Sequence, residues 1–326
     1  MRINKLILMA STAFATSISA AQAEISVIAS IKPVHSLVAG VMKGVGSPNI
    51  IVDGAGSPHS YSLKPSQAKE LQEANAVFWF GRDLETFLEK PIEALSSNAN
   101  VVKLLDTDGL LKLEFREGGP FSEHDHDDHD DHDDHDKDHD DHNDHDDHGD
   151  HDGHAHGEHD PHAWLSIENA QTWLNLVAGK LSAADPDNAG VYFANAAAAR
   201  EEINDLVKEV NSILEPVRGR NFVVFHDAYQ YFETSFDFPA AGAISLGDAT
   251  DPSAARIAEI QDRVKDEGIN CVLSEPQYNA NLVATVLSGT DAKTGVIDPL
   301  GLGLEPGSRL YGDLIRNMAK ALAGCL

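Results

Sequence analysis

The sequence is short of basic residues. Its 326 residues include 24 Lys and Arg against 53 Asp and Glu, a formal net charge of -29. Residues 121–160 hold 17 Asp and 2 Glu against 1 Lys, so -18 of this charge lies there and -11 on the rest. A chain without a basic stripe does not neutralise a row of phosphates, and we therefore expect no nucleic-acid partner.

Cysteine is equally scarce, because Cys271 and Cys325 are the only two. They are 54 positions apart and form no C-x-x-C pair, which disfavours a two-cysteine metal site. In an oxidising compartment an even pair favours a disulfide. The chain-entropy model gives such a bridge about 4 kcal/mol of stabilisation before any strain.

Long apolar runs are also missing. A transmembrane helix needs about 20 apolar residues, and no run in the sequence is that long. The N-terminal apolar run follows Arg2 and Lys5 and precedes Ala21-Gln22-Ala23, an A-x-A cleavage signal. We interpret residues 1–23 as a secretory signal peptide. We therefore expect the mature chain to begin at Glu24. No cysteine near the cleavage site offers a lipid attachment point. Because a protein without a lipid anchor needs an outer membrane to retain it, we expect a Gram-negative periplasm.

Histidine, by contrast, is concentrated in one tract. Of 17 His, 13 lie between residues 124 and 159, mostly in His-Asp-Asp triplets. An acidic linker explains the Asp but not the His, whereas imidazole and carboxylate both bind first-row metals. Stacked like charges oppose a helix and nothing apolar is available to bury, so we predict a tract that is disordered without metal and binds weakly. The predicted auxiliary sites are His124, His126, His129, His132, His135, His139, His142, His145, His148, His151, His154, His156 and His159.

On both sides of the tract, strand-like and helix-like segments alternate, which predicts α/β lobes with mainly parallel sheets flanked by helices. The predicted strands are 25–30, 49–52, 77–80, 101–105, 221–225, 239–243, 270–273 and 295–297. Ser166 is a candidate cap for a helix that ends at Asp185. The long helical pattern 188–214 fits either a rigid strut between two lobes or a surface helix of the second half. The predicted divisions are an N-terminal lobe 24–186 containing the loop 121–160, a linking helix 187–217 and a C-terminal lobe 218–326.

Potential metal ligands collect where such sheets bind ligands, beyond the carboxyl ends of their strands. Four of them lie in loops that follow predicted strands: His59, His226, Glu275 and Asp298. His162 lies on the segment that leads from the tract back into the fold. One such histidine alone is more often a hydrogen-bonded structural residue, but three of the four histidines outside the tract can converge in one cleft. The fourth, His35, falls just inside a helix start and is interpreted as structural.

Five motifs carry a family resemblance. They are Gly56-Ser57-Pro58-His59, Asp160-Pro161-His162-Ala163-Trp164, Phe225-His226-Asp227-Ala228-Tyr229, Ser274-Glu275-Pro276-Gln277-Tyr278 and Ile297-Asp298-Pro299-Leu300-Gly301. In this order they resemble the motif series of the zinc-specific periplasmic binding proteins of the ZnuA family, cluster A-I. The resemblance covers the whole mature chain. It implies two α/β lobes joined by one long rigid helix, with metal in the cleft between the lobes and a His-rich charged loop in the position of the tract.

The resemblance also implies roles for single residues. His59, His162 and His226 match the three zinc-ligand positions. Asp298 matches a position that is a ligand in manganese-type relatives and a variable or distant fourth group in zinc-type ones. Glu275 matches no ligand, and we expect it to line the cleft or support a ligand. The two cysteines resemble a bridge present in some zinc-type members.

The leading hypothesis is a monomeric zinc receptor that captures Zn²⁺ in the periplasm and delivers it to the permease of an ABC transporter, without catalysing a reaction. One alternative is a secreted zinc hydrolase, in which three His hold zinc and Glu275 acts as a base. No H-E-x-x-H motif supports it. A manganese-type receptor is a second alternative, but manganese prefers more oxygen ligands than three imidazoles leave room for. A buffer in which the tract alone binds metal leaves the folded body without a role.

Overall fold

The computed structural model describes residues 25–54, 56–116, 159–245, 253–278 and 280–326. The predicted signal peptide and all tract histidines except His159 lie outside these residues.

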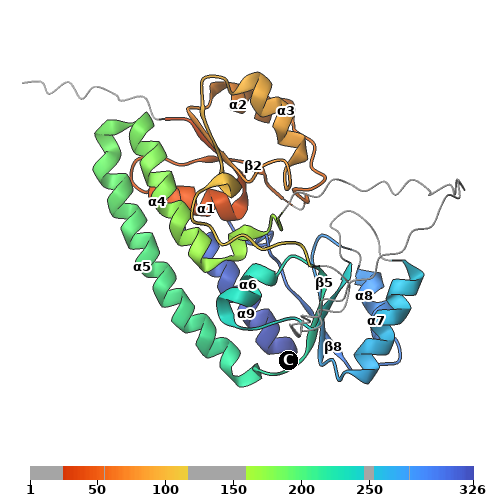
Figure 1. Ribbon diagram of the computed structural model, residues 1–326. Helices are drawn as coiled ribbons and strands as arrows, with labels where there is room; N and C mark the ends of the chain where they lie inside the picture. The colour runs from red at the N-terminus through yellow and green to blue at the C-terminus, as the bar shows by residue number, and fades with distance from the viewer. Residues whose placement is uncertain (1–24, 55, 117–158, 246–252, 279) are drawn as a thin grey trace, which may run out of the picture.

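The described chain forms two lobes, each with a four-stranded parallel sheet (Figure 1). The N-terminal sheet has the order β2-β1-β3-β4 and the C-terminal sheet the order β6-β5-β7-β8. The strands are β1 (Val27–Ile31), β2 (Asn49–Val52), β3 (Ala76–Trp79), β4 (Asn100–Lys103), β5 (Phe222–His226), β6 (Gly242–Ser245), β7 (Cys271–Ser274) and β8 (Lys293–Val296).

Helices cover the sheets and connect the lobes. They are α1 (Lys32–Val41), α2 (Pro65–Glu73), α3 (Thr86–Leu95), α4 (Ile167–Ala184), α5 (Ala189–Leu214), α6 (Gln230–Phe236), α7 (Ala254–Asp266), α8 (Ala280–Leu287) and α9 (Leu310–Cys325). Ser166 caps α4 as predicted, because its hydroxyl accepts a hydrogen bond from the backbone N–H of Asn169 at 3.2 Å. No helix in the described part of the chain is long and apolar enough to cross a membrane.

The central strands are continuous apolar runs because helices cover both of their faces. All residues of β1 and β5 are buried. At the edge of the second sheet, β8 is largely exposed, and it begins two residues before the predicted strand 295–297. The alternation of strands and helices therefore predicted the parallel architecture correctly in both lobes.

Helix α5 is the element that spans the two lobes. Its 26 residues correspond to about 39 Å of helix. In Figure 1 it runs along one side of the whole molecule, and it packs against α1 of the first lobe and α9 of the second. A single buried stripe that includes Tyr192, Ile203 and Leu214 makes these contacts possible. This arrangement favours the strut interpretation over a surface helix of one lobe.

Polar contacts also tie the lobes together beside the cleft. The buried Lys32 ammonium, at the start of α1, donates to the carbonyl oxygens of Leu302 and Leu304 at 3.1 Å each. Trp164 donates its indole N–H to the carbonyl of Pro299 at 2.8 Å. Each contact joins a residue of the first lobe to the loop that follows β8, so this loop of the second lobe is held against the first lobe at two points.

The disulfide predicted from the cysteine pair is present. It joins Cys271, the first residue of β7, to Cys325, the last residue of α9, with their Cα atoms 5.8 Å apart. Both cysteines are buried. The bridge therefore fixes the C-terminal helix to the sheet of the second lobe.

Candidate metal centre

The structure brings the three predicted histidines together. His226 is the last residue of β5, His59 lies in the loop that follows β2, and His162 directly precedes the short 3-10 helix Ala163–Leu165. The ring centres of His59 and His162 are 5.4 Å apart, and those of His162 and His226 are 5.3 Å apart. Three segments distant in sequence thus converge at the carboxyl ends of two sheets, as expected for ligands of open α/β sheets.

These separations fit imidazoles around one ion. With Zn–N bonds of about 2.0–2.1 Å in a tetrahedral arrangement, neighbouring ring centres lie roughly 5 Å apart. Nevertheless, among the described residues no group of three or more His, Cys, Asp or Glu side chains is already close enough to hold a metal ion. The three rings are therefore gathered, but in this conformation their donor atoms are not arranged around one common point.

The cavity between the histidines is very small. Its volume is about 20 Å³, enough for about one water-sized occupant. Its lining residues come from both lobes: Ser57, Pro58, His59, His162, Trp164, His226, Glu275, Gln277, Tyr278, Pro299 and Leu300. The apolar and aromatic members of this set limit the access of water to whatever the imidazoles bind.

A buried carboxylate stands behind His162. Asp160 accepts a hydrogen bond from the His162 ring Nδ1 at 2.6 Å and from the His162 backbone N–H at 2.9 Å. Because the carboxylate only accepts, Nδ1 carries the proton and Nε2 keeps a lone pair available for a metal. Gln230, on α6, donates to the other Asp160 oxygen at 2.6 Å. The sequence reasoning did not assign Asp160 a role, although a carboxylate two residues before a candidate ligand was the available signal.

A second carboxylate stands behind His226. Glu275 follows β7 and accepts a hydrogen bond from the His226 ring Nδ1. Glu275 is itself only 3% exposed. The neighbouring Tyr229 hydroxyl has a pKa well above its usual value, first because of burial and then because of the Glu275 carboxylate. Glu275 therefore lines the cavity and contacts His226, as we expected for a residue that matches no ligand position, and it polarises His226 in the way Asp160 polarises His162.

Asp298 lies close by but does not line the cavity. Its Oδ1 accepts backbone N–H groups of Leu300 and Gly301 at 3.0 and 2.9 Å, and its Oδ2 accepts that of Leu302 at 2.6 Å. Pro299 and Leu300 face the histidines instead. In this conformation the side chain of Asp298 organises the loop that forms one wall of the cavity.

The chain segments that flank the tract are fixed to the same region. Arg116 forms ion pairs with Asp227 and Glu233 of the second lobe. Burial raises the pKa of both carboxyl groups, and the Arg116 guanidinium counteracts this by favouring their charged forms. At the other flank, the Asp160 backbone N–H donates to the carbonyl of Leu113 at 2.9 Å. The described residues nearest to the tract on its two sides are thus held next to the histidine cluster.

The remaining histidine of the fold is placed elsewhere. His35, in α1, has its ring Nε2 3.0 Å from the carbonyl oxygen of Pro48. Burial is the main reason that its pKa is lowered. It does not line the cavity between the other three histidines, in agreement with the structural role predicted for it.

Comparison with known proteins gives consistent matches over nearly the whole chain. Residues 27–325 match the family described as ZnuA, zinc-uptake complex component A, periplasmic. The high-affinity zinc uptake system protein ZnuA of Brucella abortus (strain 2308) is 51% identical over 304 residues, which are 92% of this chain and 91% of the relative. The protein of the same name from Paracoccus denitrificans (strain Pd 1222) is 46% identical over 321 residues, 98% of this chain and 97% of the relative.

Solved structures share the fold at low identity. A crystal structure of ZnuA superposes with a TM-score of 0.72 at 22% identity, covering 92% of this chain and 98% of the other. The binding protein FpvC of Pseudomonas aeruginosa, in complex with Mn²⁺, also gives 0.72, at 17% identity and with 93% and 98% coverage. Since both structures have this fold, the fold alone does not decide which metal is bound.

Proposed function

The chain belongs to the ZnuA family of periplasmic zinc-uptake components, and from that premise we propose that it is a monomeric periplasmic receptor for Zn²⁺. It captures the ion between its two lobes and delivers it to the permease of an ATP-driven importer in the inner membrane. The relatives at 51% and 46% identity are both named for high-affinity zinc uptake. Zinc is the cargo, and no reaction on it is required.

His59, His162 and His226 are the proposed ligands. The observation that carries this assignment is the convergence of three imidazoles, at ring separations of 5.3 and 5.4 Å, on one ion-sized cavity. In two of them the Nδ1 atom faces a buried carboxylate. Such carboxylate–histidine pairs fix the ring orientation and make the other ring nitrogen a stronger donor to a metal.

The fourth ligand is proposed to be water rather than Asp298. To reach the ion, Asp298 would have to release at least one oxygen from the hydrogen bonds with which it holds the loop of residues 300–302. A water molecule needs no such rearrangement. With three imidazoles and one water, the site has the coordination number and the nitrogen-rich donor set that suit zinc.

Manganese is a weaker candidate for the same reason. It prefers hard oxygen ligands and six-coordinate sites, whereas the cavity offers three imidazoles and one carboxylate, Glu275, which is already hydrogen-bonded to His226. The divisions 24–186, 187–217 and 218–326 are proposed as two lobes and a linking helix. The His/Asp-rich loop 121–160 is proposed as an auxiliary collector of weakly bound metal near the cleft.

The small cavity also argues against the hydrolase alternative. A volume of about 20 Å³ admits an ion or a water molecule, but no peptide or ester group. Glu275, the candidate base, is engaged with His226. Both observations favour a closed carrier site over a catalytic one.

The decisive experiment is zinc binding measured by calorimetry in competition with a chelator. Removing the residue that supports a metal ligand costs about 10- to 100-fold in metal affinity. The His226→Ala variant loses a ligand itself, so its zinc affinity should fall by at least about a hundredfold. His226→Glu should shift the preference toward manganese by adding oxygen donors. His35→Asn is the matched control and should bind zinc like the wild type.

Two outcomes would contradict the proposal. One is wild-type protein that binds manganese as tightly as zinc at its tight site. The other is zinc-dependent turnover of ester or peptide substrates by the purified protein. Delivery is tested separately by uptake assays. In cells that lack the importer permease, zinc uptake should be the same with and without the receptor.

A further inference from the structure

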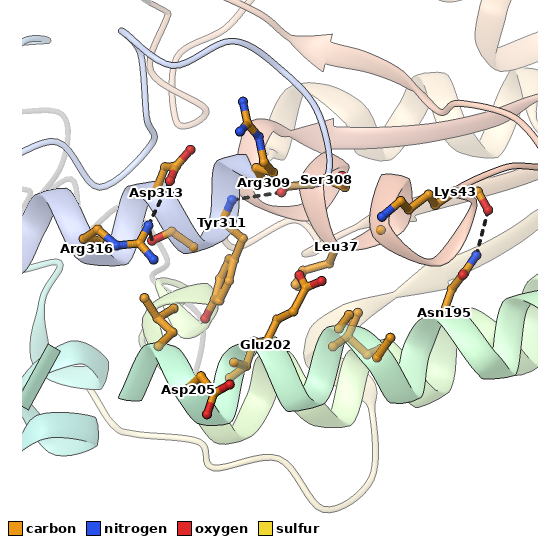
Figure 2. Close-up of a pocket in the computed structure, with 18 of the residues that line it drawn as sticks. Leu37, Lys43, Asn195, Glu202, Asp205, Ser308, Arg309, Tyr311, Asp313 and Arg316 are labelled. Atoms are coloured by element: carbon orange, nitrogen blue, oxygen red, sulfur yellow. Dashed lines mark hydrogen bonds and ion pairs between the residues drawn. The ribbon is translucent and has the colours of Figure 1, made fainter. Parts of the chain in front are cut away.

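A second cavity lies between α1, α5 and α9. Its volume is about 400 Å³, within the range of pockets that hold small organic ligands. Helix α1 belongs to the first lobe, α9 to the second, and α5 links them, so all three parts of the molecule form its walls (Figure 2). It shares no lining residue with the histidine cavity.

Most charges around this cavity neutralise one another. Arg316 pairs with Glu209 at 2.7 Å and with Asp313 at 2.8 Å. Asp205 pairs with Lys208 at 2.8 Å. These pairs need no ligand.

Three charged side chains are left over: Lys43, Glu202 and Arg309, of which Arg309 points away from the other two in Figure 2. Within the described residues, neither the Lys43 ammonium nor the Glu202 carboxylate has an ion-pair or side-chain hydrogen-bond partner, and the two do not pair with each other. Figure 2 shows the Lys43 side chain extending from the end of α1 into the space above α5, and the Glu202 side chain rising from α5 into the same space. Apolar side chains, among them Leu37 and Leu206, line the cavity with them.

The fold fixes the backbone at Lys43 and Glu202, whose side chains are exposed. Asn195, on α5, donates to the carbonyl oxygens of Val41 and Lys43 at 2.9 and 2.8 Å, which holds the end of α1 against α5. Glu202 follows two turns later on the same long helix. The two side chains therefore start from backbone positions that need no rearrangement when a ligand binds, although their ends must still be ordered, which costs binding free energy.

We propose that this cavity binds a small zwitterion, with its carboxylate at Lys43 and its ammonium group at Glu202. A short methylene chain between the two groups would lie against the apolar wall. A simple anion or a simple cation would satisfy only one of the two side chains. The chemical class is therefore that of amino acids and related dipolar metabolites.

The cavity is connected to the histidine cluster through Tyr311. Tyr311 lines the cavity, donates its backbone N–H to Ser36 Oγ at 2.9 Å, and donates its hydroxyl to the carbonyl of Trp164 at 3.1 Å. The Trp164 ring lies 5.2 Å from the His162 ring. A ligand that holds α1 and α5 together beside Tyr311 therefore stabilises the lobe arrangement in which the histidines are gathered.

Binding at the two sites should then be coupled with a positive sign. By linkage, zinc must tighten zwitterion binding by the same factor by which the zwitterion tightens zinc binding. The coupling rests on the proposed zinc site, whereas binding of the zwitterion does not. We expect a coupling of about fivefold or more.

The experiment titrates metal-free mature protein with glycine, β-alanine, 4-aminobutyrate and 6-aminohexanoate, followed by protein-observed NMR. One chain length should bind best, while propionate and propylamine should bind at least about tenfold more weakly than it. Glu202→Gln and Lys43→Gln should each lose this preference. Glu201→Gln is the matched control, because Glu201 is exposed on the same helix turn but does not line the cavity.

The coupling is measured as the affinity of the best zwitterion for zinc-loaded and for metal-free protein, with unbound zinc removed. Equal binding of all compounds, or unchanged binding in the Glu202→Gln and Lys43→Gln variants, would overturn the site. Selective binding with equal affinities in the two metal states would overturn the coupling alone. Failure of the proposed function is seen separately, as absence of tight zinc binding in the wild type without any zwitterion.

Discussion

The buried carboxylate of Asp160 offers the sharpest test of how the metal centre works. Asp160 is 1% exposed and accepts three hydrogen bonds, from the ring and the backbone of His162 and from Gln230. In an Asp160→Asn variant, the amide oxygen can still accept from the ring and the backbone N–H of His162, but the negative charge behind the ring is lost. The other ring nitrogen of His162 would then be a weaker donor to zinc.

The expected loss can be given a magnitude. Removing the partner behind a metal-bound histidine costs about 10- to 100-fold in metal affinity. This corresponds to about 1.4–2.8 kcal/mol of binding free energy. Because the side chains have the same shape, the fold should persist, and the loss should appear in zinc binding more than in the thermal midpoint.

The assay is chelator competition for the tight zinc ion, with circular dichroism as the check on folding. Asp185→Asn is the matched control, because Asp185 is also buried and accepts hydrogen bonds from Tyr192 and Asn188, but lies at the junction of α4 and α5. Wild-type zinc affinity in Asp160→Asn would refute the reasoning. So would an equal loss in Asp185→Asn, since the effect would then be one of general destabilisation.

Three further predictions concern the tract, the disulfide and a buried carboxyl group. Deleting residues 124–159 should lower the number of zinc ions bound but leave one tight site in calorimetry. If the deletion variant has no tight site, the tight site lies in the tract. Replacing Cys271 and Cys325 by Ala should cost the second lobe about 4 kcal/mol in the chain-entropy model, seen in hydrogen exchange as loss of protection around β7 and α9 with little change in the first lobe. Burial raises the pKa of Glu85 to about 7; the folded state therefore holds this proton more tightly than the unfolded chain, and stability of the first lobe should fall as pH rises from about 4.5 to 7. Glu85→Gln should flatten this part of the profile in urea unfolding, and an unchanged slope would show that another group is responsible.

The sequence by itself determined the architecture and identified most of the residues of the candidate site. Apolar runs covered by helices on both faces predict parallel strands, and β2 was predicted with its observed bounds, Asn49–Val52. The cap at Ser166 and the disulfide followed from local chemistry and from cysteine number. The three histidines were identified because they follow strands or flank the tract, and parallel strands bring such loops to one edge.

The short helix α6 was not predicted, and its absence from the expected elements hid part of the site. Its seven residues, Gln230–Phe236, are too few to show a helical period, and three of them are aromatic residues that also suit a strand. Gln230 nevertheless reaches Asp160, 70 positions earlier in the chain. No local pattern reports a hydrogen bond over that distance.

Only the tertiary structure decided how the donor atoms are used. Asp298 looks like a ligand by type and position, but three backbone N–H groups of its own loop occupy its oxygens. Glu275 looks equally suited to bind metal, yet its contact with His226 makes it a supporting group. The cavity beside Lys43 exists because α1, α5 and α9 meet there. Residue type and spacing limit which groups can bind a ligand, while the packing of distant segments determines which of their atoms remain available to do so.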